Sequence, residues 1–302
     1  MDAEQLSFSA FLVGVALTAV ASAAYLAAPL WPRVSYAGAA AGVGSSITVT
    51  ARGGPPAWLP SAASAATWLA VAALTASLAG RWAASGHPPY ANMWEFTVGF
   101  GWGILASYAL FEWRFRARDA EQTAGVFVLP VALALFIIAL LFFPSGVQPL
   151  VPALQSNRIL GAHVASMMLS YAVLSVSFGA AALYLVQGGG RRRRFARLPD
   201  SESLDEIGHR AVLVGFPLLT LGLALGAFWA HQAWSRYWGW DPKETSALII
   251  WLMYGGYLHA RNLRGWRGRP AAWLLIGGFV AMMFSYFVVN LWVDGLHSYA
   301  GV

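Results

Sequence analysis

Eight apolar stretches, each close to the length needed to cross a lipid bilayer, constrain this chain more than any other feature of its sequence. They lie near residues 7–28, 62–80, 93–113, 125–143, 159–187, 210–230, 245–260 and 271–293. A helix that crosses the hydrocarbon core needs roughly 20 mostly apolar residues. Only 11% of the 302 residues are charged, against about 25% in a soluble domain. We therefore predict an all-α polytopic membrane bundle of about eight transmembrane helices, forming a single domain over residues 1–302.

Basic residues are divided unequally between the two ends of these helices. If the helices alternate in direction, most of the 19 basic residues lie at one end. The exceptions are Arg81, Arg158, Arg236 and Lys243. Because loops rich in Lys and Arg are retained in the cytoplasm, the N-terminus and the C-terminus are predicted to lie outside. The net charge of +6 is thus a topology signal, and no nucleic-acid binding is expected of the Arg191–Arg194 run, which acidic residues follow.

Two absences narrow the chemistry further. The chain contains no cysteine, so a metal would have to be bound by imidazole, thioether or oxygen. The first apolar stretch follows Met-Asp-Ala-Glu-Gln, which lacks the basic residues of a secretory signal, and it is expected to remain as a span. A flexible, solvated loop is expected at 188–209, and no soluble domain is expected.

The segment at 229–244 concentrates aromatic rings beside the only lysine of the chain. Its rings are Trp229, Trp234, Tyr237, Trp238 and Trp240. Indoles gather at membrane interfaces, so an aromatic belt that anchors the next helix is one interpretation. The other is an aromatic shelf edged by two cations, Arg236 and Lys243, which suits a flat, apolar ligand that ends in carboxylates.

The residues that close this segment also have a local explanation. Asp241, Pro242 and Glu244 occupy the N-cap, N1 and N3 positions of a helix start, where these residue types are preferred. The pattern predicts that the seventh helix begins here, and it requires no ligand.

Haem is a flat ligand of the required kind, and histidine is a common axial ligand of its iron. His163 lies in the first turns of the fifth stretch and His297 just beyond the end of the eighth. Both are therefore predicted to lie at the depth of the aromatic segment. A lone interfacial histidine is usually structural, whereas two that flank one aromatic segment are consistent with an axial pair.

The other histidines fit this pair less well. His231 adjoins the aromatic segment and is interpreted as a local hydrogen bonder, and His209 is expected to be solvated in the charged loop. His259 lies near the cytoplasmic end of the seventh stretch, too far from His163 and His297 to share one haem. An ionisable group in a span is nevertheless a functional candidate.

Four motifs in this order resemble those of the CcsA (ResC) family, which acts in the system II cytochrome c biogenesis pathway. The segment 229–244 resembles the WWD signature of haem-handling proteins. GHPPYANMWE at 86–95 resembles the family's GHxPxxNxYE segment, with Trp94 in place of the usual tyrosine. LQSNRILGAHVASMMLSYA at 154–172 and NLWVDGLHSY at 290–299 resemble its two histidine segments. The resemblance covers about residues 80–302.

The resemblance implies roles for individual positions. His163 and His297 match the external histidines that ligate haem, and the external loop from Trp234 to Asp241 matches its platform. His259 matches the intramembrane histidine of a second haem site, whose other ligand comes from the partner protein CcsB. His87 matches a family position without an assigned role.

Two residues depart from the family pattern within the platform. Ser235 stands where the family usually has glycine, and His231 stands where a small polar residue such as asparagine is common. A slightly different shelf geometry is expected here.

The function that the resemblance implies is cytochrome c synthesis. Together with CcsB, such a haem lyase brings haem b to the outer face and joins its vinyl groups to the two thiols of CxxCH in an apocytochrome c. No side chain is assigned as a general acid or base. The expected location is the plasma (inner) membrane of a bacterium, in contact with its lipid, with a thylakoid membrane as the alternative.

Two other functions remain open at this point. A haem exporter or chaperone resembling CcmC would use the same residues without performing the ligation. A structural or small-solute membrane protein would use its tryptophans only as an interfacial belt.

Overall fold

The computed structural model describes residues 2–30, 56, 58–114, 119–150, 155, 158–190, 194–195 and 199–297. Its elements are α1 Ala3–Leu30, α2 Trp58–Ser85, α3 Met93–Arg114, α4 Asp119–Phe142, α5 Arg158–Val186, α6 Ser201–Trp234, α7 Pro242–Arg264, α8 Arg269–Phe284, the π-helix η2 Ser285–Val289 and α9 Asn290–Trp292. No strand occurs in these ranges. The predicted all-α bundle of eight long helices is therefore confirmed. Each of the first seven predicted stretches coincides with one helix, and the eighth covers α8, η2 and α9.

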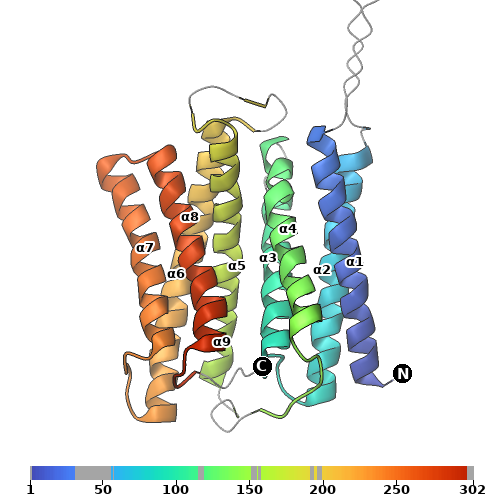
Figure 1. Ribbon diagram of the computed structural model, residues 1–302, viewed down its shortest axis with the longest axis vertical. Coiled ribbons are helices and arrows are strands. Elements are labelled where there is room, and N and C mark those ends of the chain that lie inside the picture. Colours follow the sequence, from blue (N-terminus) through green and yellow to red (C-terminus); the bar gives the residue numbers. More distant parts are fainter. Residues whose placement is uncertain are drawn as a thin grey trace, which may run out of the picture.

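The helices stand side by side and alternate in direction (Figure 1). α1 to α4 form one half of the bundle and α5 to α8 the other, and the two halves meet mainly where α3 and α4 pack against α5. The start of α1, the loop from α6 to α7 and the end of α9 lie at the same end of the bundle (Figure 1). This arrangement agrees with the predicted alternation of spans.

Six helices are long and apolar enough to cross a membrane: α1, α2, α4, α5, α6 and α8 with its extension. α3 and α7 fall short of this standard, although they lie alongside the other six (Figure 1). α3 contains two buried glutamates, and α7 carries charged residues at both ends. These polar groups need hydrogen-bond or charge partners inside the bundle. The charged residues at the start of α7 belong to the site described below.

Charged residues at the opposite end of the bundle follow the predicted pattern where they are described. Arg194, Arg264 and Arg267 belong to its loops and helix ends. The basic residues at 33, 52, 116, 118, 191–193 and 197 lie outside the described residues.

One predicted loop is shorter than expected. α6 begins at Ser201, because Asp200 caps it by accepting a 2.8 Å hydrogen bond from the Ser203 amide. The prediction of a loop through residue 209 is therefore wrong. His209 lies on α6, where its Nδ1 is 3.4 Å from the hydroxyl of Tyr257, so it is a partly buried helix residue.

Arg81 and Glu95 form a buried ion pair at the end of the bundle that carries the α6–α7 loop. Arg81 Nε lies 2.8 Å from Glu95 Oε1, and the two side chains are 1% and 0% exposed. The same guanidinium donates to the carbonyl oxygens of Ser145 and Gly146 and lies over the ring of Trp94. Because a buried ion pair stabilises only when its remaining hydrogen bonds are satisfied, this network fixes α2, α3 and the loop after α4 relative to one another.

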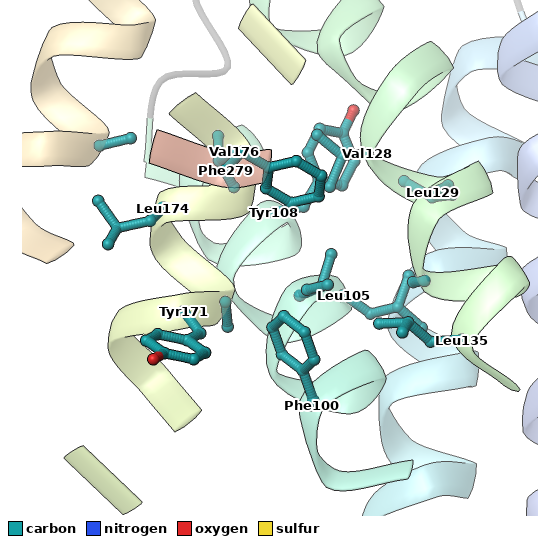
Figure 2. Close-up of a cluster of buried hydrophobic side chains, with 14 of the residues drawn as sticks. Phe100, Leu105, Tyr108, Val128, Leu129, Leu135, Tyr171, Leu174, Val176 and Phe279 are labelled. Atoms are coloured by element: carbon teal, nitrogen blue, oxygen red, sulfur yellow. The ribbon is translucent and has the colours of Figure 1, made fainter. Parts of the chain in front are cut away.

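The hydrophobic core lies where α3, α4 and α5 meet. Leu105 of α3 and Leu135 of α4 point into one cluster, and Phe100 and Tyr171 lie at its edge (Figure 2). The rings of Phe100 and Tyr171 have centroids 6.2 Å apart. Their position matters because both rings also line the cavity described next.

Candidate functional site

A cavity opens between α3, α5, α6, α7 and the segment from η2 to His297. The space between the atoms that line it is about 1130 Å³, a figure that includes open solvent. The wall is mainly apolar and aromatic and includes Phe96, Phe100, Met167, Tyr171, Trp238 and Tyr286. Among its few polar residues are His163, Lys243, Asn290 and His297. The chemistry of this wall therefore suits an apolar, aromatic ligand that makes a few polar contacts.

His163 is oriented by a backbone carbonyl of α6. Its Nδ1 lies 2.8 Å from Gly222 O, and because a carbonyl only accepts, Nδ1 carries the proton and the lone pair is on Nε2. The absence of a side chain at Gly226 leaves room for the His163 ring, since a Cβ at residue 226 would lie 2.7 Å from Cε1 of the imidazole. The ring is thus fixed in the tautomer that can ligate a metal through Nε2.

His297 is oriented in the same way by a carboxylate. Its Nδ1 lies 2.8 Å from Asp241 Oδ2, while Asp241 Oδ1 accepts a hydrogen bond of 2.6 Å from the amide of Leu296. Gly295 permits this approach, because a Cβ there would lie 2.6 Å from Asp241 Oδ1. A carboxylate on the second ring nitrogen is typical of metal-ligating histidines.

Asp241 also caps α7, as the sequence predicts. It accepts a hydrogen bond of 3.0 Å from the amide of Lys243, and Glu244 accepts from the amide of Asp241, which completes a capping box. Burial by itself would raise the pKa of Asp241. The hydrogen bonds from His297 and from the amides of Leu296 and Lys243 together lower it by more, so the pKa lies below its ordinary value of 3.8. Asp241 is therefore an anion at neutral pH, and it both caps α7 and orients His297.

Trp229 lies close to both histidines. Its ring is nearly parallel to that of His163, with centroids 6.4 Å apart, and its centroid is 5.9 Å from that of His297. Trp229 is only 2% exposed and packs with Tyr90 and Leu160. The GHPPYANMWE segment thus supports the histidines through Tyr90, a contribution that sequence analysis did not assign.

The aromatic loop does not present all its rings to the cavity. Tyr237 and Trp238 line the wall, whereas Trp234 packs edge-on against His297 with centroids 5.1 Å apart. Trp240 is 69% exposed, lies edge-on to Trp238 and has a φ of 57°. Positive φ is rare for a bulky residue. The loop therefore combines one wall of the cavity, a support for His297 and an exposed ring.

The two cations of the loop lie in different places. Arg236 is exposed and its guanidinium packs over Gly239, away from the residues that line the cavity. Lys243 lines the cavity, and its Nζ donates to Asn290 Oδ1 at 2.6 Å and to Ser285 O at 3.2 Å. Lys243 thus borders the cavity and points into the bundle, whereas Arg236 does not belong to the cavity wall.

The other histidines lie apart from the cavity wall. His231 is exposed and stacks on Tyr237, with centroids 4.3 Å apart. His87 lies between two loops, with its Nδ1 2.9 Å from Pro88 O and its Nε2 3.0 Å from Gln148 O. His259 is exposed on α7, close to the opposite end of that helix, as the sequence predicts.

Fold and site together define a class of protein: a polytopic helical membrane protein with an aromatic cavity at one end and two oriented histidines beside it. The chain belongs to the cytochrome C assembly protein family, whose profile matches residues 90–297. The match extends from Tyr90 to His297 and so includes every residue of the cavity wall. It confirms the resemblance that the four motifs predict.

Similar proteins agree with this assignment. The chain is 36% identical to the cytochrome c biogenesis protein CcsA of Microcystis aeruginosa, over 80% of this chain and 88% of the relative. It is 39% identical to CcsA of Guillardia theta, over 77% and 83% of the two chains. A solved structure of the cytochrome c heme lyase CcmF has the same fold, with a TM-score of 0.67 at 17% identity. The match covers 95% of this chain but only 47% of CcmF.

Proposed function

We propose that the cavity binds haem between His163 and His297 and that the chain takes part in joining this haem to apocytochrome c. The observation that carries the proposal is the matched orientation of the two imidazoles, each with its Nδ1 hydrogen-bonded to the protein. Nε2 is then the nitrogen that would face the iron from either side. The names of the relatives, cytochrome c biogenesis proteins and a heme lyase, support the same function.

In this function the chain acts by positioning its substrate. Haem supplies two vinyl groups, and each receives the S–H of one thiol of the CxxCH motif across its C=C bond. Holding the reacting groups at near-attack distance can contribute several kcal/mol to such a step. Trp238 and Tyr237 would contact the porphyrin face, and Trp229 and Trp234 would keep the two imidazoles in place. No residue of the cavity is assigned as an acid or base.

A second membrane protein of the CcsB kind is proposed as partner. His259 is exposed on α7, so its imidazole can be reached from outside this chain. We propose that it forms half of a second haem site, with the other ligand supplied by CcsB. Haem b is the form proposed at both sites, and the proposed location is the plasma membrane of a bacterium.

The orientation in the membrane is part of the proposal. The basic residues at the end opposite the cavity support an outward-facing cavity, with both termini outside. Single cysteines can be introduced at Ser235 and at Gly265, since the chain has none of its own. An impermeant thiol reagent applied to intact cells should label the first and not the second. Labelling of Gly265→Cys alone would reverse the orientation.

Axial ligation is tested by His163→Ala and His297→Ala in the purified protein. Each variant should lose haem or show a changed absorption spectrum, and added imidazole should restore the bis-histidine spectrum. His231→Ala is the matched control, because His231 adjoins the loop but stacks on Tyr237. Parent spectra in both variants without imidazole would refute the assignment.

Ligation activity is tested separately. The protein is combined with CcsB, haem and an apocytochrome c, and the product is denatured and examined for haem that remains attached. Covalent haem is expected. A protein that only exports haem would deliver it in a form that denaturation releases.

A further inference from the structure

Lys243 is a basic residue in the wall of the cavity. The charge of Asp241 acts on it, but no carboxylate of the described residues forms a close ion pair with its Nζ. Its two hydrogen-bond acceptors, Asn290 Oδ1 and Ser285 O, are both neutral. Neighbouring carboxylates are already engaged: Asp241 with His297, and Glu244 with the amides of Gly239 and Asp241. An ammonium group in an apolar wall is costly unless an anion compensates it. The structure therefore has a place for an anion beside Lys243.

This place lies deeper in the bundle than His297. η2 and α9 lead outward to His297, and the groups that Lys243 contacts precede His297 along this path by 12 residues (Ser285) and 7 residues (Asn290). The side chain of Lys243 thus reaches from the start of α7 toward the bundle interior. Its Nζ lies on the inner side of the cavity, away from the exposed loop.

A second polar group at the same depth lacks a partner. Tyr171 is 6% exposed and lines the cavity, and its hydroxyl makes no hydrogen bond of ordinary geometry within the described ranges, although Ser285 is near. The hydroxyl of Ser285 is already paired with that of Ser246 at 2.7 Å. A buried, unpaired hydroxyl is unusual in a native protein, and a ligand that accepts a hydrogen bond at this point would satisfy it.

We propose that Lys243 and Tyr171 bind the carboxylates of haem at the inner end of the cavity. The haem would then enter with its propionate edge first, and this inference rests on the proposed function. Haem carries both propionates along one edge and its vinyl groups on the other two rings. The vinyl groups therefore face the mouth between Trp238 and His297, where the thiols of an apocytochrome arrive. The opposite orientation would leave Lys243 without an anion and would place the vinyl groups where no peptide reaches.

The test compares two porphyrins on the full-length purified protein: iron protoporphyrin IX and its dimethyl ester, which lacks both negative charges. The parent protein should bind the ester about 10- to 100-fold more weakly, as expected for the loss of a charge-assisted hydrogen bond. Lys243→Met should bind the two porphyrins with nearly equal affinity. Arg236→Met is the matched control, and it should discriminate between them as the parent does.

The outcomes separate orientation from haem binding itself. Equal or tighter binding of the ester by the parent protein would overturn the proposal, and so would a Lys243→Met variant that keeps the full preference for the acid. If neither porphyrin binds with a bis-histidine spectrum, the proposed function fails instead. Tyr171→Phe removes only a hydroxyl and should reduce the preference in part. The ester affinity of each variant shows whether its cavity is intact. The comparison of the two porphyrins on the parent protein tests the proposal even if Lys243→Met does not fold.

Discussion

Replacing Asp241 with asparagine tests whether the helix cap is also the support of a haem ligand. The Asp241 carboxylate accepts hydrogen bonds from His297 Nδ1 at 2.8 Å, from the Leu296 amide at 2.6 Å and from the Lys243 amide at 3.0 Å, and in the capping box also from the Glu244 amide. Asparagine has one acceptor oxygen and one NH₂ group. In either orientation of the amide, the NH₂ group therefore faces at least one N–H donor or the Nδ1 of His297.

The size of the effect follows from these contacts. A hydrogen bond to a charged group contributes about 1.5–3 kcal/mol, and a buried donor left without a partner costs about 1–3 kcal/mol. If the NH₂ group faces His297, Nδ1 must accept, and the proton moves to Nε2, where it blocks ligation. Loss of such a carboxylate support typically lowers metal affinity about 10- to 100-fold. We expect Asp241→Asn to lower haem content strongly, with partial recovery on addition of imidazole.

Asp200→Asn is the matched control for this experiment. Asp200 caps α6 as Asp241 caps α7, by accepting from the amide of Ser203 at 2.8 Å. Its carboxylate also accepts from the Ser203 hydroxyl, and neither contact involves a histidine. Both variants should lower the unfolding temperature, and only Asp241→Asn should lower haem per protein and change the absorption spectrum. If Asp241→Asn retains as much haem as Asp200→Asn, with the parent spectrum, Asp241 is only a helix cap.

Three further predictions concern the loop between α6 and α7. Ser235 has a φ of 57°, so Ser235→Gly should stabilise the protein by about 1 kcal/mol, measured as a higher unfolding temperature with unchanged haem content; destabilisation would show that the serine side chain matters more. Trp238→Ala should lower haem content more than Trp240→Ala without changing the spectrum, because only Trp238 lines the cavity; equal losses would contradict this. The pKa of Asp241 is lowered on folding. Its contribution to stability is therefore present above pH 3.8 and is lost as the pH falls through the folded-state pKa. The unfolding temperature should accordingly decline more steeply between pH 5 and 3 in the parent than in Asp241→Asn.

Sequence patterns predicted the helices and the outer histidines because these depend on local properties. Span length and apolar composition determine where a membrane helix can form, and alternation of spans then places His163 and His297 at one end. The cap at Asp241 is equally local, since it needs only residues 241–244. Within the described ranges, these predictions required no knowledge of which helices are neighbours.

Contacts between distant segments could not be predicted in this way. Asp241 and His297 are 56 residues apart, and Lys243 and Asn290 are 47 residues apart, so both contacts depend on how α7 packs against α8. Asn290 gave a signal that the sequence analysis did not use, because a polar residue inside an apolar stretch needs a partner. The buried pair of Arg81 and Glu95 gave a similar signal.

The π-helix at Ser285–Val289 lets the segment after α8 hold one residue more than a continuous α-helix along the same path would hold. In an α-helix each residue turns the chain by about 100°, and a π-helix accommodates one residue more than the regular helix would. Five residues of π-helix turn the chain by about as much as four residues of α-helix, so deleting one residue of this segment would allow a continuous α-helix and would leave Asn290 and the path to His297 in nearly the same direction. Shortening this segment by one residue would thus keep both polar groups at the cavity, whereas a second deletion would find no extra residue to remove and would turn Asn290 and His297 away from it by about 100°.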